Sequence, residues 1–292
     1  MTTLAAARHV LVVDDDRAFR HAVATLLQKA GYATAQAGDG VDALAQLRAA
    51  RLDLVLLDIG LPGINGLEVL AEARRLPSPP RIVIITGDDT PGALLASFRE
   101  QADRFVRKPI TPQRIVEVVK ETLAVSPATT LPIEVVSATP EWVELVAPCS
   151  LDVADRIQEF VMNLDADVPA ETRESVGQAF RELLTNAIEW GGRLDATQQV
   201  RIACLRTKRM RLYRIADPGE GFDVGLLPHA AVSNSPDDPL EHARVREGLG
   251  LRPGGLGLLM TRALVDEVIY NEKRNEVVLV KYLDEVNDAH DH

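Results

Sequence analysis

The chain has 292 residues, 46% of them hydrophobic, which is enough for about two globular domains with ordinary apolar cores. Its formal net charge is -11 and no stretch interleaves Lys or Arg with aromatic residues, which argues against a nucleic-acid-binding surface. The N-terminus reads as a first strand rather than a signal peptide, and no long uncharged apolar segment follows, so we expect a cytoplasmic protein with no membrane association. Cys149 and Cys204 fit neither a metal site nor a disulfide framework, and are predicted to be core residues.

Residues 1–124 alternate short apolar runs with helical stretches. The runs HVLVV, LVLLD, RIVIIT and RFVRK predict strands, and residues 18–30 and 112–123 are typical of the helices between them. Because the runs are continuously apolar, each strand should be covered on both faces. The pattern therefore predicts an α/β domain with a doubly wound parallel sheet.

Residues 125–140 concentrate Pro, Ser and Thr and are predicted to be a linker. A second, α+β domain is predicted over residues 141–284, followed by an acidic, frayed tail over 285–292. Its predicted elements, in chain order, are a strand at 142–147, a helix at 153–164, a helix ending at Gly191 and Gly192, strands at 200–205 and 211–216, a long loop, a helix at 256–267 and a strand at 276–282.

In the first domain, polar residues follow four strands, at the edge where an open parallel sheet holds its chemistry. They are Asp14 and Asp15, Asp58, Thr86, and Lys108. Three crowded carboxylates repel one another unless a lysine and a hard cation such as Mg²⁺ offset their charge. The pattern predicts a metal-assisted phosphoryl acceptor, with Asp58 as nucleophile and Lys108 and Thr86 holding the product oxygens. Helix-capping aspartates beside an incidental lysine are the alternative.

The segments VLVVDDD, LVLLDIGLPGINGLEVL, IITG and RFVRKP together resemble the receiver domain of two-component response regulators, over about residues 8–124. The resemblance implies a five-stranded flavodoxin-like fold and phosphorylation of Asp58 by a sensor histidine kinase. It implies Mg²⁺ bound in the pocket of Asp14 and Asp15, with Asp15 as the direct ligand, together with Asp58 and the Gly60 carbonyl.

The same resemblance implies switch positions at Thr86 and Phe105 and a cis peptide bond before Pro109. Two residues depart from the usual receiver pattern. Gln101 stands where glycine is common, and Gly60 offers no side chain near the acyl phosphate.

In the second domain, a helix over the segment FRELLTNAIEWGG places Glu182 and Asn186 one turn apart, beside a full apolar stripe. Taken alone, the pair is a solvated polar face. The later segment DPGEGFD places Asp217 at a strand end, where its carboxylate can accept from the exocyclic amine of adenine.

Glycines surround this aspartate and precede the next helix. Gly219 and Gly221 leave room for a ring to approach the backbone, and a helix N-terminus with Gly254, Gly255 and Gly257 offers N–H groups to phosphates. In chain order, the three motifs predict one ATP site. Asn186 would bind Mg²⁺ and Glu182 would orient or deprotonate a nucleophile.

This arrangement resembles the GHKL ATPase fold of histidine kinases, gyrase and Hsp90-type chaperones, which implies a mixed sheet with helices on one face. The segments RELLTNAIEWGG, DPGEGFD, GGLGLLMTRALVDEV and YNEKRNEVVLVKYL look most like anti-sigma-factor serine kinases of partner-switching systems. Trp190 replaces a histidine common in that group, and residues 224–253 are predicted to form a long lid.

None of the six histidines lies in the H-E-x-x context of a kinase phosphoacceptor. The chain is therefore interpreted as a response regulator whose output is a serine/threonine kinase of an anti-sigma antagonist. A homodimer is one assembly open to it. Two alternatives remain open. The second domain could bind nucleotide and sequester a sigma factor or antagonist without catalysis, or it could be a phosphodonor or phosphatase partner for other receivers.

Overall fold

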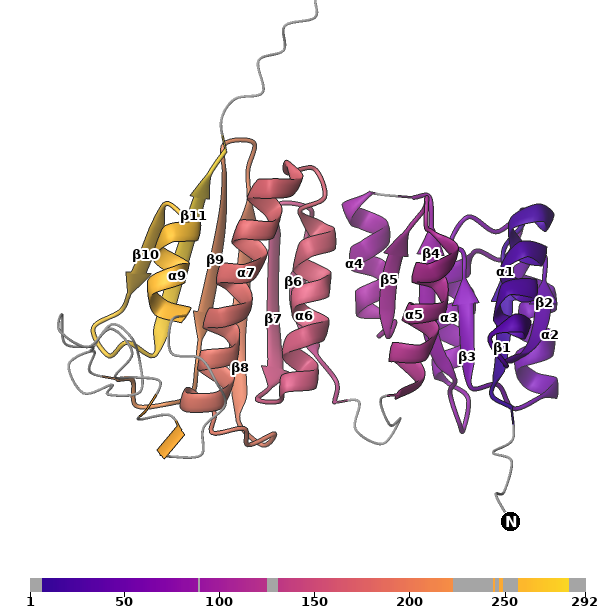
Figure 1. Ribbon diagram of the computed structural model, residues 1–292, viewed down its shortest axis with the longest axis horizontal. Coiled ribbons are helices and arrows are strands. Elements are labelled where there is room, and N and C mark those ends of the chain that lie inside the picture. Colours follow the sequence, from indigo (N-terminus) through magenta and orange to yellow (C-terminus); the bar gives the residue numbers. More distant parts are fainter. Residues whose placement is uncertain are drawn as a thin grey trace, which may run out of the picture. The chain divides into compact units, whose positions relative to one another are not determined.

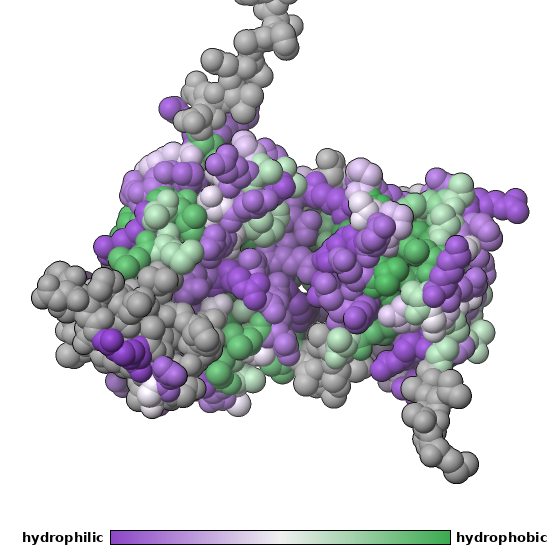
Figure 2. All heavy atoms as spheres, viewed as in Figure 1, coloured by the Kyte–Doolittle hydropathy of each residue, from purple (hydrophilic) through white to green (hydrophobic). Residues whose placement is uncertain are grey.

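The computed structural model describes residues 7–88, 90–124, 131–222, 244, 247–248 and 257–283. The chain separates into two compact units, residues 1–130 and 131–292. Figure 2 shows hydrophilic side chains over most of the visible face of each unit, with small hydrophobic patches between them, as is normal for water-exposed domains. Among the described residues, no helix is both long and apolar enough to span a bilayer.

The first unit is a parallel sheet of five strands in the order β2-β1-β3-β4-β5, confirming the predicted α/β fold. Helices α1 and α5 pack together, as do α2 and α3, and they cover the two faces of the sheet (Figure 1). The elements in chain order are β1 His9–Val13, α1 Arg17–Lys29, β2 Ala33–Ala37, α2 Gly40–Ala49, β3 Leu54–Leu57, α3 Gly66–Arg74, β4 Arg81–Thr86, α4 Pro91–Arg99, β5 Arg104–Arg107 and α5 Pro112–Ala124.

Local sequence sets where these helices begin. Asp16, Asp39, Asn65 and Thr90 each accept a hydrogen bond from a backbone N–H of the first turn of α1, α2, α3 and α4. The strands β1, β3 and β4 are buried along almost their whole length, which explains their unbroken apolar runs. Gln101, at a position where glycine is common, adopts a φ of 59°, a conformation that glycine takes without strain.

The second unit is a six-stranded sheet in the order β10-β11-β9-β8-β7-β6, with α6, α7 and α9 on one face (Figure 1). The elements are β6 Glu134–Ala138, β7 Trp142–Pro148, α6 Leu151–Leu164, α7 Ala170–Asn186, the π-helical turn η2 Ala187–Gly191, β8 Gln199–Arg206, β9 Met210–Ala216, α9 Gly257–Leu264, β10 Glu267–Tyr270 and β11 Glu276–Tyr282. The α+β fold is as predicted.

Three details of the sequence interpretation are wrong. Residues 134–138, placed in the linker, form the edge strand β6, which pairs with β7. The helix expected to run to Glu267 ends at Leu264, and Glu267 begins β10 instead. Every strand pairing in the described sheet is antiparallel, where a mixed sheet was expected. Short edge strands carry little periodic signal, which is why β6 and β10 were missed.

Packing against the helices fixes the sheet of the second unit. Phe180 of α7 meets Tyr213 of β9 with ring centroids 5.5 Å apart, and both side chains are fully buried. The Tyr213 hydroxyl donates to Asp165 in the α6–α7 connection, which also accepts from Arg206 Nε at 3.2 Å and Arg211 Nε at 2.9 Å. This buried network fastens that connection to the β8–β9 hairpin, and with it one end of α7.

Candidate functional site

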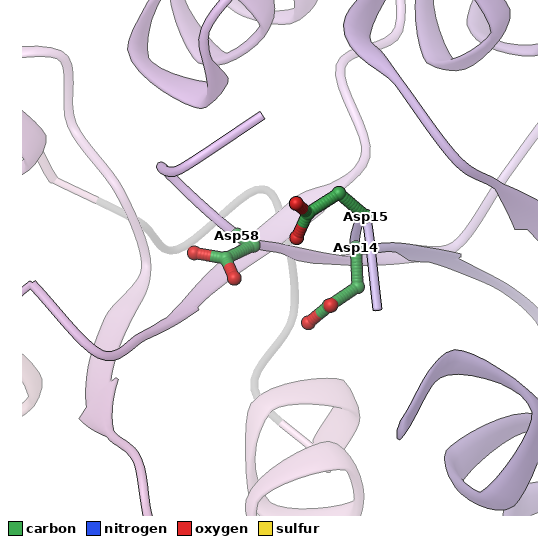
Figure 3. Close-up of side chains that lie close together, drawn as sticks. All are labelled: Asp14, Asp15 and Asp58. Atoms are coloured by element: carbon green, nitrogen blue, oxygen red, sulfur yellow. The ribbon is translucent and has the colours of Figure 1, made fainter. Parts of the chain in front are cut away.

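Five polar side chains gather at the C-terminal edge of the first sheet. Asp14 and Asp15 follow β1, Asp58 follows β3, Thr86 ends β4 and Lys108 follows β5. Because the strands are parallel, their C-terminal ends meet at this edge. Ligand oxygens of the three aspartates lie within 4.8 Å of one another, and the carboxylates form one cluster (Figure 3). Their number and spacing fit a hard divalent cation.

The helix-capping alternative does not account for these aspartates. Asp16 caps α1, whereas Asp14 and Asp58 are buried and Asp15 is exposed beside them. Asp14 Oδ1 accepts a hydrogen bond from the Asp16 N–H at 2.9 Å. Because Asp16 already caps the helix, capping does not explain the buried carboxylates. Burying a carboxylate costs free energy unless it is paired with a cation.

Lys108 holds the cluster together. Its Nζ lies 2.6 Å from Asp14 Oδ2 and 2.6 Å from Asp58 Oδ2. It also lies 4.6 Å from the ring centroid of Phe19 on α1, a cation–π contact that the sequence did not reveal. Burial by itself would lower the pKa of Lys108, but the hydrogen bonds to both carboxylates outweigh burial and raise it. The Lys108–Pro109 peptide bond is cis, as the receiver resemblance implied.

The two buried carboxylates have pKa values shifted in opposite directions. Burial dominates at Asp14 and raises its pKa, although Lys108 opposes the shift. At Asp58, burial is outweighed by hydrogen bonds from Lys108, the Gly60 N–H at 3.1 Å and Thr86, and the net pKa is lowered. Asp58 is therefore ionised at neutral pH, which a carboxylate nucleophile requires.

Thr86, Phe105 and Gly66 lie around this cluster. Thr86 is buried and its Oγ1 accepts from the Asp88 N–H at 3.2 Å, while Phe105 is buried in the neighbouring strand. Gly66, at the start of α3, lets the helix approach closely, because a β-carbon there would lie 2.0 Å from the Asp58 carbonyl oxygen. That glycine was not singled out from the sequence.

A second cluster lies in the other unit, where α7 packs against α9. Glu182 and Asn186 are half-buried on α7, and neither side chain forms a hydrogen bond or ion pair with another described residue. By contrast, Arg181 beside them is exposed and bonded to Gln158 at 2.7 Å. Half-buried polar side chains without described partners, on a helix that packs against α9, favour a ligand site over a solvated face.

The π-helical turn η2 directly follows Asn186. Its wider ring is closed by the Gly192 N–H, which donates to the Ala187 carbonyl at 2.8 Å. The turn brings Gly191 against Asp217, where a β-carbon would stand 2.2 Å from the carboxylate carbon, and Gly192 against Cys149. π-turns inside helices are often found at functional sites. Neither the turn nor these two contacts was foreseen from the sequence.

Asp217 follows β9 and is half-buried. Burial raises its pKa, and the Gly219 N–H, which donates to Oδ1 at 2.8 Å, opposes the rise. Gly219 and Gly221 were expected to make room for a ring. The structure shows that both glycines also permit close contacts within the protein, since a β-carbon at Gly219 would lie 2.8 Å from Asp217 Oδ1 and one at Gly221 would lie 1.5 Å from the Lys273 carbonyl oxygen.

The glycines predicted to bind phosphate are only partly visible. Gly257 is the first residue of α9, while Gly254 and Gly255 lie outside the described residues, as does most of the predicted lid. Within the described residues, the structure thus packs α7, which carries Glu182 and Asn186, against α9, and it brings Gly191 of η2 next to Asp217.

The fold of the first unit and its acidic cluster are those of a receiver domain. Comparison with protein-family models assigns a domain type to each of the two units. Residues 10–120 match the model of the response regulator receiver domain, and residues 148–281 match the histidine kinase-like ATPase domain. The second domain is thus of the GHKL type.

The chain is also similar to individual known proteins. The DNA-binding response regulator MtrA of Mycobacterium tuberculosis H37Rv is 30% identical over 212 residues, which cover 72% of this chain and 90% of MtrA. The transcriptional regulatory protein ResD of Bacillus subtilis is 32% identical over 39% of this chain and 47% of its own length. A solved receiver domain from Methanospirillum hungatei is 30% identical, with a TM-score of 0.40 and coverage of 40% of this chain and 94% of that one. The chain belongs to the response regulator family.

Proposed function

We propose that this protein is a phosphorylation-controlled switch in which Asp58 accepts a phosphoryl group and the second domain, loaded with ATP, acts on a protein partner. The observation that carries the proposal is that Lys108 bridges Asp14 and Asp58. This bridge keeps the buried Asp58, the proposed nucleophile, ionised beside a positive charge. A sensor histidine kinase is the proposed phosphodonor.

In the receiver, an Asp58 carboxylate oxygen attacks the phosphorus, and the bond to the donor's imidazole nitrogen breaks. Lys108 and Thr86 then hold the oxygens of the acyl phosphate, because both already contact Asp58. Asp14, Asp15, Asp58 and the Gly60 carbonyl would hold Mg²⁺. The ion would supply positive charge against the transferring phosphoryl group.

In the second domain, the proposed ATP site lies between α7 and α9. Asp217 accepts from the adenine amine, and the backbone from Gly254 to Gly257 meets the phosphates. Asn186 would bind the Mg²⁺ that accompanies ATP. Glu182 takes the proton from the hydroxyl of a serine or threonine on the partner. The half-buried side chains of Glu182 and Asn186, which have no partner among the described residues, support these roles.

We propose an anti-sigma antagonist as the phosphorylated partner, in a cytoplasmic partner-switching pathway. Two other outputs remain, which are sequestration of a sigma factor or antagonist without catalysis, and phosphate exchange with other receivers. Acid-stable phosphate on a partner serine or threonine selects the kinase. A stoichiometric complex without phosphate transfer selects sequestration, and acid-labile phosphate on another protein selects the third.

The receiver part is tested by intact-mass measurement of the full chain with a small acyl phosphate donor and Mg²⁺. Wild type should gain one phosphoryl group and Asp58→Asn should gain none. Asp42→Asn, an exposed aspartate on α2, is the matched control and should label like wild type. Equal labelling of wild type and Asp58→Asn would remove Asp58 as the acceptor.

The nucleotide part is tested by calorimetry on the same protein. Asn186→Ala should weaken the Mg²⁺-dependent part of ATP affinity, whereas Glu182→Ala should spare binding and slow turnover by about 10²-fold or more. Gln178→Ala, at an exposed position of α7, is the control for the helix. A folded protein that binds no nucleotide would end this part of the proposal.

Control of the output is tested by measuring ATP or partner affinity with and without a phosphoryl mimic. A change of about 5- to 150-fold is typical of allosteric coupling. It should vanish in Asp58→Asn. An unchanged affinity in the full chain would mean that the receiver does not regulate this output.

A further inference from the structure

The loop after Asp217 is fastened to the turn between β10 and β11, at residues 271–275. The Asp217 N–H donates to the Asn275 carbonyl oxygen at 2.9 Å, and Asn275 Nδ2 donates to the Gly219 carbonyl oxygen at 3.0 Å. Asn275 thus binds the loop on both sides of Pro218, once through its backbone and once through its side chain. Asn275 therefore adds to the pairing of β9 with β11 two bonds that hold the loop of Asp217.

Asn275 is itself fixed in place. Asn271 Nδ2 donates to Asn275 Oδ1 at 2.8 Å, and the Asn275 N–H donates back to Asn271 Oδ1 at 3.1 Å. The first of these bonds occupies the amide oxygen of Asn275, so its Nδ2 is left facing Gly219. The orientation of the Asn275 amide therefore follows from its hydrogen-bond network.

A close backbone contact seals the far end of the loop on the same turn. Gly221 has a φ of 87°, and a β-carbon there would lie 1.5 Å from the Lys273 carbonyl oxygen. Only glycine fits that approach. The loop from Asp217 to Gly221 is therefore held at its beginning, middle and end by residues 271–275.

The result is a carboxylate with one committed and one uncommitted oxygen. Asp217 Oδ1 accepts from the Gly219 N–H at 2.8 Å, and no described donor contacts Oδ2. The backbone of Gly191 lies close to Cγ and Oδ1 of Asp217, which restricts movement of the side chain on that side. A half-buried acceptor with a fixed orientation is suited to one N–H donor of a ligand.

We infer that Asn275 is a positioning residue for base recognition: it presets Asp217 so that the free Oδ2 accepts from the exocyclic amine of a purine ring. The inference rests on the proposed nucleotide function and adds to it the residue that sets base specificity. Asn275 does not touch the nucleotide, and its effect passes through the loop and Asp217.

The test compares two ligands by calorimetry on the full chain: ADP, and purine riboside 5′-diphosphate, which lacks the 6-amino group. Wild type should bind ADP about tenfold more tightly, the value of one good hydrogen bond to a charged acceptor. Asn275→Ala should weaken ADP binding to about the level of the analogue while leaving the analogue within about twofold of wild type. A general loosening of the fold would weaken both ligands.

A double-mutant cycle ties the effect to Asp217. Asp217→Ala should abolish the preference for ADP, and adding Asn275→Ala to it should change neither affinity further. Asn275→Asp, which keeps the size and the oxygen that Asn271 binds, should lose the preference as Asn275→Ala does, and it serves if the alanine variant fails to fold. Asn163→Ala, which removes a side-chain bond to the Glu159 carbonyl on α6, is the control and should keep the preference.

Three results would overturn the inference. Equal weakening of both ligands by Asn275→Ala would reduce Asn275 to a structural role. A wild type that binds both ligands equally would show that Asp217 does not read the amine, although the nucleotide function would stand. A folded wild type that binds neither ligand would refute the nucleotide function and the inference together.

Discussion

The backbone of Gly191 lies directly against the carboxylate of Asp217, so that a β-carbon at Gly191 would stand 2.2 Å from Asp217 Oδ1. Gly191 is the last residue of the π-helical turn η2, and Asp217 directly follows β9. The contact joins two motifs that are remote in the sequence. It also restricts movement of the Asp217 side chain on the side of Oδ1.

Gly191→Ala tests this contact. The added methyl group must displace Asp217 or unwind η2, so we expect the second domain to lose about 1–3 kcal/mol of stability and most of its nucleotide affinity. Denaturant unfolding and calorimetry measure the two effects. Gly248→Ala is the control, because an added β-carbon there meets no described atom within 4 Å. Unchanged affinity in Gly191→Ala would separate Gly191 from the site.

Asp217→Asn should stabilise the ligand-free second domain. Burial raises the pKa of Asp217, so the folded state holds this proton more tightly than the unfolded chain does. Ionisation at neutral pH therefore destabilises the fold, and the cost disappears as pH falls through the folded-state pKa. Asparagine keeps an oxygen for the Gly219 N–H but carries no charge.

We expect the melting temperature of the second domain to rise by about 2 °C at neutral pH in Asp217→Asn. The gain should shrink as pH is lowered, while nucleotide affinity falls. Scanning calorimetry across pH measures the first effect. A variant that is less stable than wild type at every pH would contradict the account of Asp217 as a carboxylate kept for function at a cost in stability.

Lys108→Ala should expose the repulsion within the acidic cluster. Asp14 and Asp58 are 2% and 7% exposed, and the substitution leaves both without their cation. Removing one partner of such a group costs about 3 kcal/mol of receiver stability. Millimolar Mg²⁺ should restore part of the loss, because the three carboxylates can share the ion.

Chemical denaturation with and without a chelator measures this effect. Lys120→Ala, which removes an exposed lysine from α5, should change neither the stability nor its Mg²⁺ dependence. If Mg²⁺ leaves both wild type and Lys108→Ala unchanged, the cluster does not bind the ion.

Both cysteines should resist alkylation in the folded protein. Burial raises the pKa of Cys149 to about 11, with Asp217 and Asp195 adding to the shift, and burial also raises the pKa of Cys204. At pH 8 only about one Cys149 side chain in 10³ is a thiolate, which is the reactive form. Mass spectrometry after brief alkylation should show no adduct on native protein and two on denatured protein. A native adduct on Cys149 would show that the packing of Gly192 against Cys149 opens.

Much of the receiver could be predicted from sequence because its signals are local. Continuous apolar runs mark strands covered on both faces, and parallel strands bring their C-terminal ends to one edge whatever the loops do. Hence Asp58 and Lys108 could be expected to meet, although they follow separate strands. Their hydrogen bond is 2.6 Å long. In the second domain, the stripe around Glu182 was likewise sufficient to predict α7.

Only the tertiary structure decided how the second site is assembled. The sequence does not show which atoms a glycine approaches, and in the structure Gly191 faces Asp217 and Gly221 faces Lys273. The bond from Asn275 to Gly219 depends on the register of the β10–β11 hairpin, and β10 is too short to show a period in sequence. Sequence determined which residue types were available. Close packing between strand ends and turns decided which of them became partners, because such contacts depend on distances that no local pattern records.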